Sequence, residues 1–234
     1  MTRTLTLALL CAAAATAPAG AAERSYSVAD FDRVQVDGPY RVTLSTGGYS
    51  AARAEGSTQA LDRVSIDVQS GTLRIRPNRS AWGGYPGEAA GPVSVALTTR
   101  DLRAAAVVGS GSLAVDRAKG LRVDLSVNGS GRLSVASVAA DNLVVGLLGG
   151  GRITLAGSAK QLKATVQGSG DLHAAELRAD DAQILSDTAG NVTLGVARSV
   201  KVTSTGAGDV EILGTPSCTV EAKGSGAVLC GPGR

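Results

Sequence analysis

Three consecutive segments repeat one pattern and predict the fold: GSGSLAVDRAKGLRVDLSVN (109–128), GSGRLSVASVAADNLVVGLL (129–148) and GGGRITLAGSAKQLKATVQ (149–167). Each segment begins with a triplet of small residues, and successive triplets end 18 to 20 residues apart. The triplets are Gly109-Ser110-Gly111, Gly129-Ser130-Gly131, Gly149-Gly150-Gly151, Gly168-Ser169-Gly170, Thr188-Ala189-Gly190, Gly206-Ala207-Gly208 and Gly224-Ser225-Gly226. A fixed period in this range is typical of a solenoid, in which every repeat forms one coil.

Within each repeat, apolar residues alternate with polar or small ones. Leu113 and Val115 follow one triplet, and the run Leu121, Val123, Leu125 and Val127 precedes the next. Alternation with a period of two indicates β-strands with one buried face. We therefore predict an all-β fold, a single-stranded parallel β-helix (β-solenoid) with about 18–20 residues per coil. A β-sandwich or barrel with Gly-rich hairpins is the alternative.

The first half of the chain follows the pattern less regularly. Val34 and Val36, the corner Gly38-Pro39-Tyr40, and then Val42 and Leu44 predict a first coil. Alternating strands are expected near residues 64–68, 73–75 and 93–97, separated by a Gly/Pro-rich loop at about 78–92. Because no linker interrupts the chain, residues 23–234 are expected to form a single solenoid domain.

The composition excludes several kinds of site. The 234 residues carry a formal net charge of +3, with 23 Lys and Arg against 20 Asp and Glu, and His173 is the only histidine. A multi-histidine metal site is therefore impossible, and a Ser-His-Asp triad would have to use His173. The small excess of base does not indicate nucleic-acid binding. We predict no metal, no cofactor and no nucleic-acid partner.

The N-terminus has the features of a secretory signal peptide. Arg3 precedes an apolar run from Leu5 to Ala15, and the small residues Ala19 to Ala22 form a cleavage site. We predict a signal peptide over residues 1–22, a periplasmic, secreted or cell-surface location, and no integral membrane segment after cleavage. The alternative is a lipoprotein acylated at Cys11, although Leu10 before it is larger than such processing prefers.

Cys218 and Cys230 lie 12 residues apart near the C-terminus. In an oxidising compartment they predict one disulfide, which would clamp this end of the chain. Two buried free thiols are the alternative. We expect the segment from Tyr26 to Phe31 to cap the other end of the rod, since open end strands invite aggregation.

The sequence also resembles a known family. The segments FDRVQVDGPYRVTLSTGG (31–48) and LDRVSIDVQSGTLRIRPN (61–78), followed by the GSG repeats, resemble the head GIN domain of the family called "putative auto-transporter adhesin". The likeness covers roughly Tyr26 to Cys230. It implies a β-helical domain exported to the bacterial envelope, and it supplies no catalytic residues to carry over.

The position after each triplet is expected to point outward and to form a polar row along the rod. The row consists of Ser112, Arg132, Arg152, Asp171, Asn191, Asp209 and Ala227. Its central members, Arg132, Arg152, Asp171, Asn191 and Asp209, are candidate ligand-binding residues because Arg and Asp donate to and accept from sugar hydroxyls. The alternative is a solvated face with weak surface ion pairs.

Trp82 and Tyr85 form the aromatic-rich part of the 78–92 loop. Exposed aromatic side chains on a loop can stack on sugar rings or anchor a protein partner, so both are candidate binding residues. Alternatively, Trp82 folds back and plugs the lumen of the rod.

These observations favour an exported, non-catalytic binding or scaffold protein, adhesion-like, whose partner is a surface glycan or an envelope protein. The alternative is a carbohydrate-active β-helix enzyme, a polysaccharide lyase or hydrolase. Its candidate acids are Asp171, Asp187 and Asp209, of which only Asp171 and Asp209 share a repeat position. Two coils would separate that pair by roughly 9.6 Å, somewhat wide for paired catalytic carboxylates.

Overall fold

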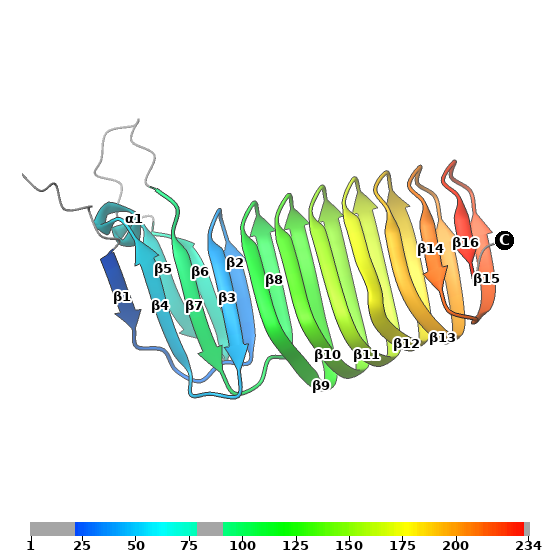
Figure 1. The fold of residues 1–234 in the computed structure, drawn as a ribbon. Helices are drawn as coiled ribbons and strands as arrows, with labels where there is room; N and C mark the ends of the chain where they lie inside the picture. Colours follow the sequence, from blue (N-terminus) through cyan, green and yellow to red (C-terminus); the bar gives the residue numbers. More distant parts are fainter. Residues whose placement is uncertain (1–21, 79–90, 232–234) are drawn as a thin grey trace, which may run out of the picture.

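Stacked strands form an elongated rod in the computed structural model, which describes residues 22–78 and 91–231 (Figure 1). In chain order, the elements are β1 (Ala22–Tyr26), β2 (Arg33–Asp37), β3 (Arg41–Thr46), β4 (Ala51–Gly56), α1 (Thr58–Asp62), β5 (Val64–Gln69), β6 (Thr72–Pro77), β7 (Ser94–Thr99), β8 (Ala104–Gly109), β9 (Ser112–Gly129), β10 (Arg132–Gly149), β11 (Arg152–Gly168), β12 (Asp171–Thr188), β13 (Val192–Ser204), β14 (Val210–Leu213), β15 (Ser217–Ala222) and β16 (Val228–Cys230).

Each of the long strands β9 to β12 follows one coil of the rod. β10 pairs in parallel with β9 on one side and with β11 on the other, so that Arg132 lies beside Ser112 and Arg152. β12 and β13 continue the stack in the same way. From β9 to β12 the register advances by 19 or 20 residues per coil, which is the length of the sequence repeat. The predicted parallel β-solenoid is therefore confirmed.

The lumen of the rod is filled by the inward-facing apolar residues that the alternation predicts. One buried row consists of Leu113, Leu133, Ile153, Leu172, Val192 and Val210, all at most 1% exposed. Leu121 departs from the prediction and is 78% exposed. The coil bends between residues 116 and 122, where consecutive exposed residues interrupt the alternation and reset it.

Glycine at the corners allows successive coils to stack closely. A Cβ added at Gly131 would lie 2.6 Å from Val107 Cγ1 and 2.7 Å from the carbonyl oxygen of Gly111, the equivalent residue one coil away. Gly129 has a φ of +120°, which L side chains rarely adopt. The triplets are therefore required by the contact between neighbouring corners.

The predicted first coil exists, but it is not the first in the stack. β2 pairs in parallel with both β6 and β8, and β3 pairs in parallel with both β7 and β9. The coil of β2 and β3 thus lies between a coil that comes later in the sequence, β6 and β7, and the regular part of the rod. Its corner stacks on the first GSG triplet, where Ser112 N donates to Tyr40 O at 2.8 Å.

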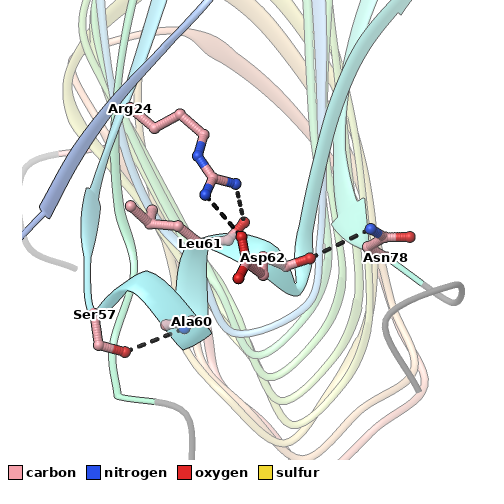
Figure 2. Close-up of polar contacts among 6 residues, drawn as sticks. All are labelled: Arg24, Ser57, Ala60, Leu61, Asp62 and Asn78. Atoms are coloured by element: carbon pink, nitrogen blue, oxygen red, sulfur yellow. Dashed lines mark hydrogen bonds and ion pairs between the residues drawn. The ribbon is translucent and has the colours of Figure 1, made fainter. Parts of the chain in front are cut away.

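The N-terminal end of the rod is covered by antiparallel strands and a short helix. β1 pairs antiparallel with β4, β4 with β7, and β5 with β6. The sequence pattern predicts neither this antiparallel pairing nor α1, whose Ala60 and Leu61 are buried. Arg24 of β1 donates to α1, to Asp62 Oδ1 at 2.7 Å and to Leu61 O at 3.2 Å (Figure 2). Ser57 Oγ caps the helix by accepting from Ala60 N.

The expected cap at this end is thus displaced along the chain. β1, which ends at Tyr26, supplies the outermost strand, whereas Phe31 is buried in the core. The hydrogen bond from Asn78 Nδ2 to Asp62 O fixes α1 to the end of β6 (Figure 2).

At the C-terminal end, β15 pairs in parallel with β13, and β16 with β14. A disulfide links Cys218 of β15 to Cys230 of β16, with their Cα atoms 6.6 Å apart. Every residue of β15 is exposed.

Within the described residues, no helix is long and apolar enough to cross a membrane. The predicted signal peptide, apart from Ala22, lies outside the described residues, as does most of the 78–92 loop.

Candidate functional site

The structure places the predicted polar row on one face of the rod, one residue per coil. Ser112, Arg132, Arg152 and Asp171 are direct register neighbours. Leu172 pairs with Val192, and Val192 with Val210, so Asn191 and Asp209 continue the row. We call Arg132, Arg152, Asp171, Asn191 and Asp209 the ladder. Neighbouring members are about 4.8 Å apart because they lie on adjacent paired strands.

Asp171 is the most constrained member of the ladder. Its Oδ2 accepts a hydrogen bond from Arg152 Nη2 at 2.9 Å, and its Oδ1 accepts from Asn191 N at 3.0 Å. The bond from Arg152, followed by that from the Asn191 amide, holds the pKa of the Asp171 carboxyl below its usual value. Asp171 is therefore ionised at neutral pH and joins three consecutive coils.

Asp209 bonds to the next coil along the chain in the same manner. Its Oδ1 accepts from Ala227 N at 2.8 Å. Two carboxylates of the ladder thus bind backbone amides of the following coil, Asp171 across a coil of 20 residues and Asp209 across one of 18. Arg132 and Asn191 present exposed side chains on either side of the Arg152–Asp171 pair.

A second outward row runs beside the ladder, two residues further along each coil. It consists of Thr43, Ala114, Ser134, Thr154, His173, Thr193 and Glu211. Most of these side chains are short, and several carry hydroxyl groups. The surface beside the ladder is therefore polar and has few long side chains that would block a ligand. His173 belongs to this row, and its register position places it two residues from Asp171 on this face.

The three candidate acids do not converge on one point. Asp171 and Asp209 lie on the ladder with Asn191 between them, and both carboxylates bind backbone amides. Asp187 pairs with Gln167 near the other end of β12, before the corner, and therefore lies on the face of the rod away from the ladder. A general acid requires a raised pKa, whereas that of Asp171 is lowered.

The structure also shows a pocket that the sequence pattern does not predict. It has a volume of about 630 Å³ and lies where segments near residues 30–33, 70–71, 100–103 and 119–120 meet. In it Asp32 forms ion pairs with two arginines, Arg33 at 3.7 Å and Arg103. The motif Phe31-Asp32-Arg33-Val34 is the signal that the sequence offers, but only the placement of β2 beside β8 brings Arg103 to it.

Trp82 and Tyr85 lie outside the described residues, so their role in binding stays a prediction. Among the described residues, no group of three or more His, Cys, Asp or Glu side chains is placed to hold a metal ion.

Comparison with known proteins gives a family match and several similar folds. Residues 30–216 match the family model described as "Putative auto-transporter adhesin, head GIN domain". No curated protein matches the chain in a sequence comparison.

Three similar crystal structures show the same fold at low sequence identity. A putative adhesin from Bacteroides fragilis is 20% identical, with a TM-score of 0.83 over 90% of this chain and 97% of that one. A putative lipid binding protein from Parabacteroides distasonis is 19% identical, with a TM-score of 0.71 over 92% and 98% of the two chains. A putative adhesin from the same species is 21% identical, with a TM-score of 0.67 over 90% and 97%.

Proposed function

Since the chain belongs to the family described as "Putative auto-transporter adhesin, head GIN domain", we propose that it is an exported, non-catalytic binding protein of the adhesin type. The ladder and the hydroxyl-rich row beside it form the binding face. The ligand class that this face fits best is a surface glycan.

The ladder is the observation that carries the proposal. It aligns hydrogen-bond donors and acceptors in one straight row, with one side chain on each coil. An extended polymer lying along the rod would meet a new polar side chain about every 4.8 Å. A polysaccharide has hydroxyl groups at a similar repeat along its length, and these can donate to Asp oxygens and accept from Arg and Asn.

The internal bonds of the ladder also support recognition of a ligand. The Arg152–Asp171 pair is already held by hydrogen bonds within the protein, so its side chains lose little freedom when a ligand arrives. Arg132 and Asn191 beside it are exposed and able to form new bonds. Names of similar proteins point to binding as well: two are called putative adhesins and one a putative lipid binding protein.

A non-catalytic role is favoured over a polysaccharide lyase or hydrolase. The two ladder carboxylates lie two coils apart and are occupied by backbone amides. The lowered pKa of Asp171 leaves it unable to deliver a proton near neutral pH. Binding requires neither property.

The test is a glycan and polysaccharide binding screen on the chain from Glu23 onward, with the double variant Arg132→Ala/Arg152→Ala alongside. We expect a specific glycan to bind and the double variant to lose at least about tenfold in affinity, which corresponds to about 1.4 kcal/mol. A matched control, Arg74→Ala/Lys163→Ala, removes two cations from the face of the rod away from the ladder and should leave binding unchanged.

A third variant, Trp82→Ala/Tyr85→Ala, tests the predicted loop site. Loss of binding in this variant alone would move the site from the ladder to the loop. Equal losses in the ladder variant and the matched control would show a nonspecific charge effect and contradict the proposal. If no glycan binds, the ligand class is wrong and envelope proteins become the partners to test.

A further inference from the structure

The two ends of the rod are built differently. At the N-terminal end, β4 and β5 pair antiparallel with the last coil, β1 extends β4, and α1 packs there with Ala60 and Leu61 buried. At the C-terminal end, β15 and β16 are the last strands of the stack (Figure 1). Among residues 22–78 and 91–231, no strand pairs with the outer edge of either one.

The open end exposes residues that belong to the lumen. Cys218, Val220 and Ala222 of β15 stack on Val200, Val202 and Ser204, which are all buried and at most 3% exposed. One coil further out, Val220 is 42% exposed. The disulfide from Cys218 to Cys230 holds the two edge strands together. The backbone of the open end is therefore held in place for pairing with another strand.

The hydrogen-bonding groups of β15 alternate in direction. Lys223 N donates to Ser204 O at 2.8 Å, so the backbone groups of Lys223 face β13. Because directions alternate along a strand, Ser217, Thr219 and Glu221 also face β13, whereas Cys218, Val220 and Ala222 direct their N–H and C=O groups outward. These three residues therefore offer three N–H donors and three C=O acceptors along one edge, which is enough to pair with one more strand.

We infer that this edge pairs with the same edge of a second copy of the chain, joining two rods end to end. A two-fold axis through Val220 pairs β15 antiparallel with its copy and matches every outward donor with an acceptor. In this register Val220 faces its counterpart, Cys218 faces Ala222, and Thr219 faces Glu221. No like charges meet, whereas moving the two-fold axis from Val220 to Glu221 would place Glu221 opposite itself.

The pairing also explains why a two-fold dimer forms in place of a filament. At the N-terminal end α1 packs with Ala60 and Leu61 buried, and on the face of the rod that carries β15 the stack ends at β5, which runs antiparallel to β6 and offers β15 no parallel edge for head-to-tail growth. That end already shows that an antiparallel strand can terminate this stack. Joining the C-terminal ends therefore closes the assembly at two copies and merges the two lumens.

The inference is tested first on the chain from Glu23 onward by sedimentation velocity over a range of concentrations and by small-angle X-ray scattering. We expect a monomer–dimer equilibrium, with the longest dimension of the dimer about twice that of the monomer. A chain that stays monomeric throughout overturns the inference, because the edge is then covered in another way. So does a dimer that is wider but no longer than the monomer.

Charge variants then test the register. Thr219→Glu places a carboxylate opposite Glu221 of the other copy at two symmetric positions and should raise the dimer dissociation constant at least about tenfold. Adding Glu221→Lys to this variant converts both contacts to opposite charges and should restore dimerisation. Because both side chains point away from the lumen, neither change disturbs the packing of the monomer. Failure of the second change to restore the dimer would overturn this register.

A further pair of variants separates edge pairing from general surface association. Val220→Glu should abolish the dimer, whereas Leu185→Glu, at a site of similar exposure (41%) on the broad face of β12, should leave it intact. Dissociation by both changes, or by Leu185→Glu alone, would show that the broad face is the contact and would contradict the inference. Glycan binding by the ladder is measured separately and does not depend on this result.

Discussion

Ser186 and Ser204 interrupt the apolar filling of the rod. They are stacked on one another in the same lumen row as Val166, both are at most 1% exposed, and neither hydroxyl has a hydrogen-bond partner among the described residues. A buried hydroxyl without a partner costs free energy that an apolar side chain of similar size does not. We therefore predict that Ser186→Ala raises the free energy of unfolding by about 1 kcal/mol.

Urea unfolding measures this difference, with Ser126→Ala as its control. Ser126 lies on the same sheet but is exposed, so its change should alter the unfolding free energy by less than about 0.5 kcal/mol. If Ser186→Ala instead destabilises the protein, the hydroxyl has a partner in solution and the explanation is wrong.

The corners are the elements in which small residues matter most. A Cβ at Gly131 would lie 2.6 Å from Val107 Cγ1 and 2.7 Å from Gly111 O, and backbone atoms of the neighbouring coil cannot easily move aside. We predict that Gly131→Ala destabilises the protein by about 1–3 kcal/mol, the usual cost of overpacking. Thermal and urea unfolding give the difference from the unsubstituted chain.

Gly146→Ala is the matched control for the corner. Gly146 lies within β10, three residues before its end, and an added Cβ would meet only Ser126 Cβ, at 3.9 Å. Its substitution should be neutral or stabilise by up to about 1 kcal/mol, because it reduces the freedom of the unfolded chain. Equal losses of unfolding free energy at Gly131 and Gly146 would show that close contact at the corners is not the reason for glycine there.

The corners also show which structural features can be predicted from the sequence repeat. Register in a solenoid follows from the repeat, so the spacing of the triplets is enough to assign Gly131, Arg152 and Asp171 to a coil, a direction and a row. The ladder is predictable for this reason. The pocket around Asp32 is not, because it depends on the order in which coils stack, and β2 lies beside β8 without any sequence period to indicate it. The five-residue helix α1 is likewise too short to show a periodic pattern.

At the scale of the whole molecule, the rod is a linear stack in which each coil contacts only its neighbours. An end coil therefore has one neighbour fewer than the rest. At the N-terminal end, the bond between Arg24 and Asp62 and the burial of Leu61 compensate for this loss. At the C-terminal end, where all of β15 is exposed, the disulfide is the equivalent restraint.

This arrangement predicts how the rod responds to reduction. Opening the Cys218–Cys230 bond frees a 12-residue loop, whose closure is worth on the order of 3 kcal/mol in the chain-entropy model. We expect reduced protein to melt at a lower temperature. Hydrogen exchange should show protection lost first in β15 and β16 and then in β13, because each frayed coil uncovers the next, while β9 to β11 keep theirs.

The variant Cys218→Ser/Cys230→Ser supplies the control for this prediction. It should melt at the temperature of the reduced protein and should not respond to added reductant. Equal melting temperatures and equal exchange in oxidised and reduced protein would show that the bond does not hold the end of the rod. A loss of protection spread evenly over β9 to β16 would contradict the linear stack itself, since only a globally cooperative unit transmits a change at one end to every coil at once.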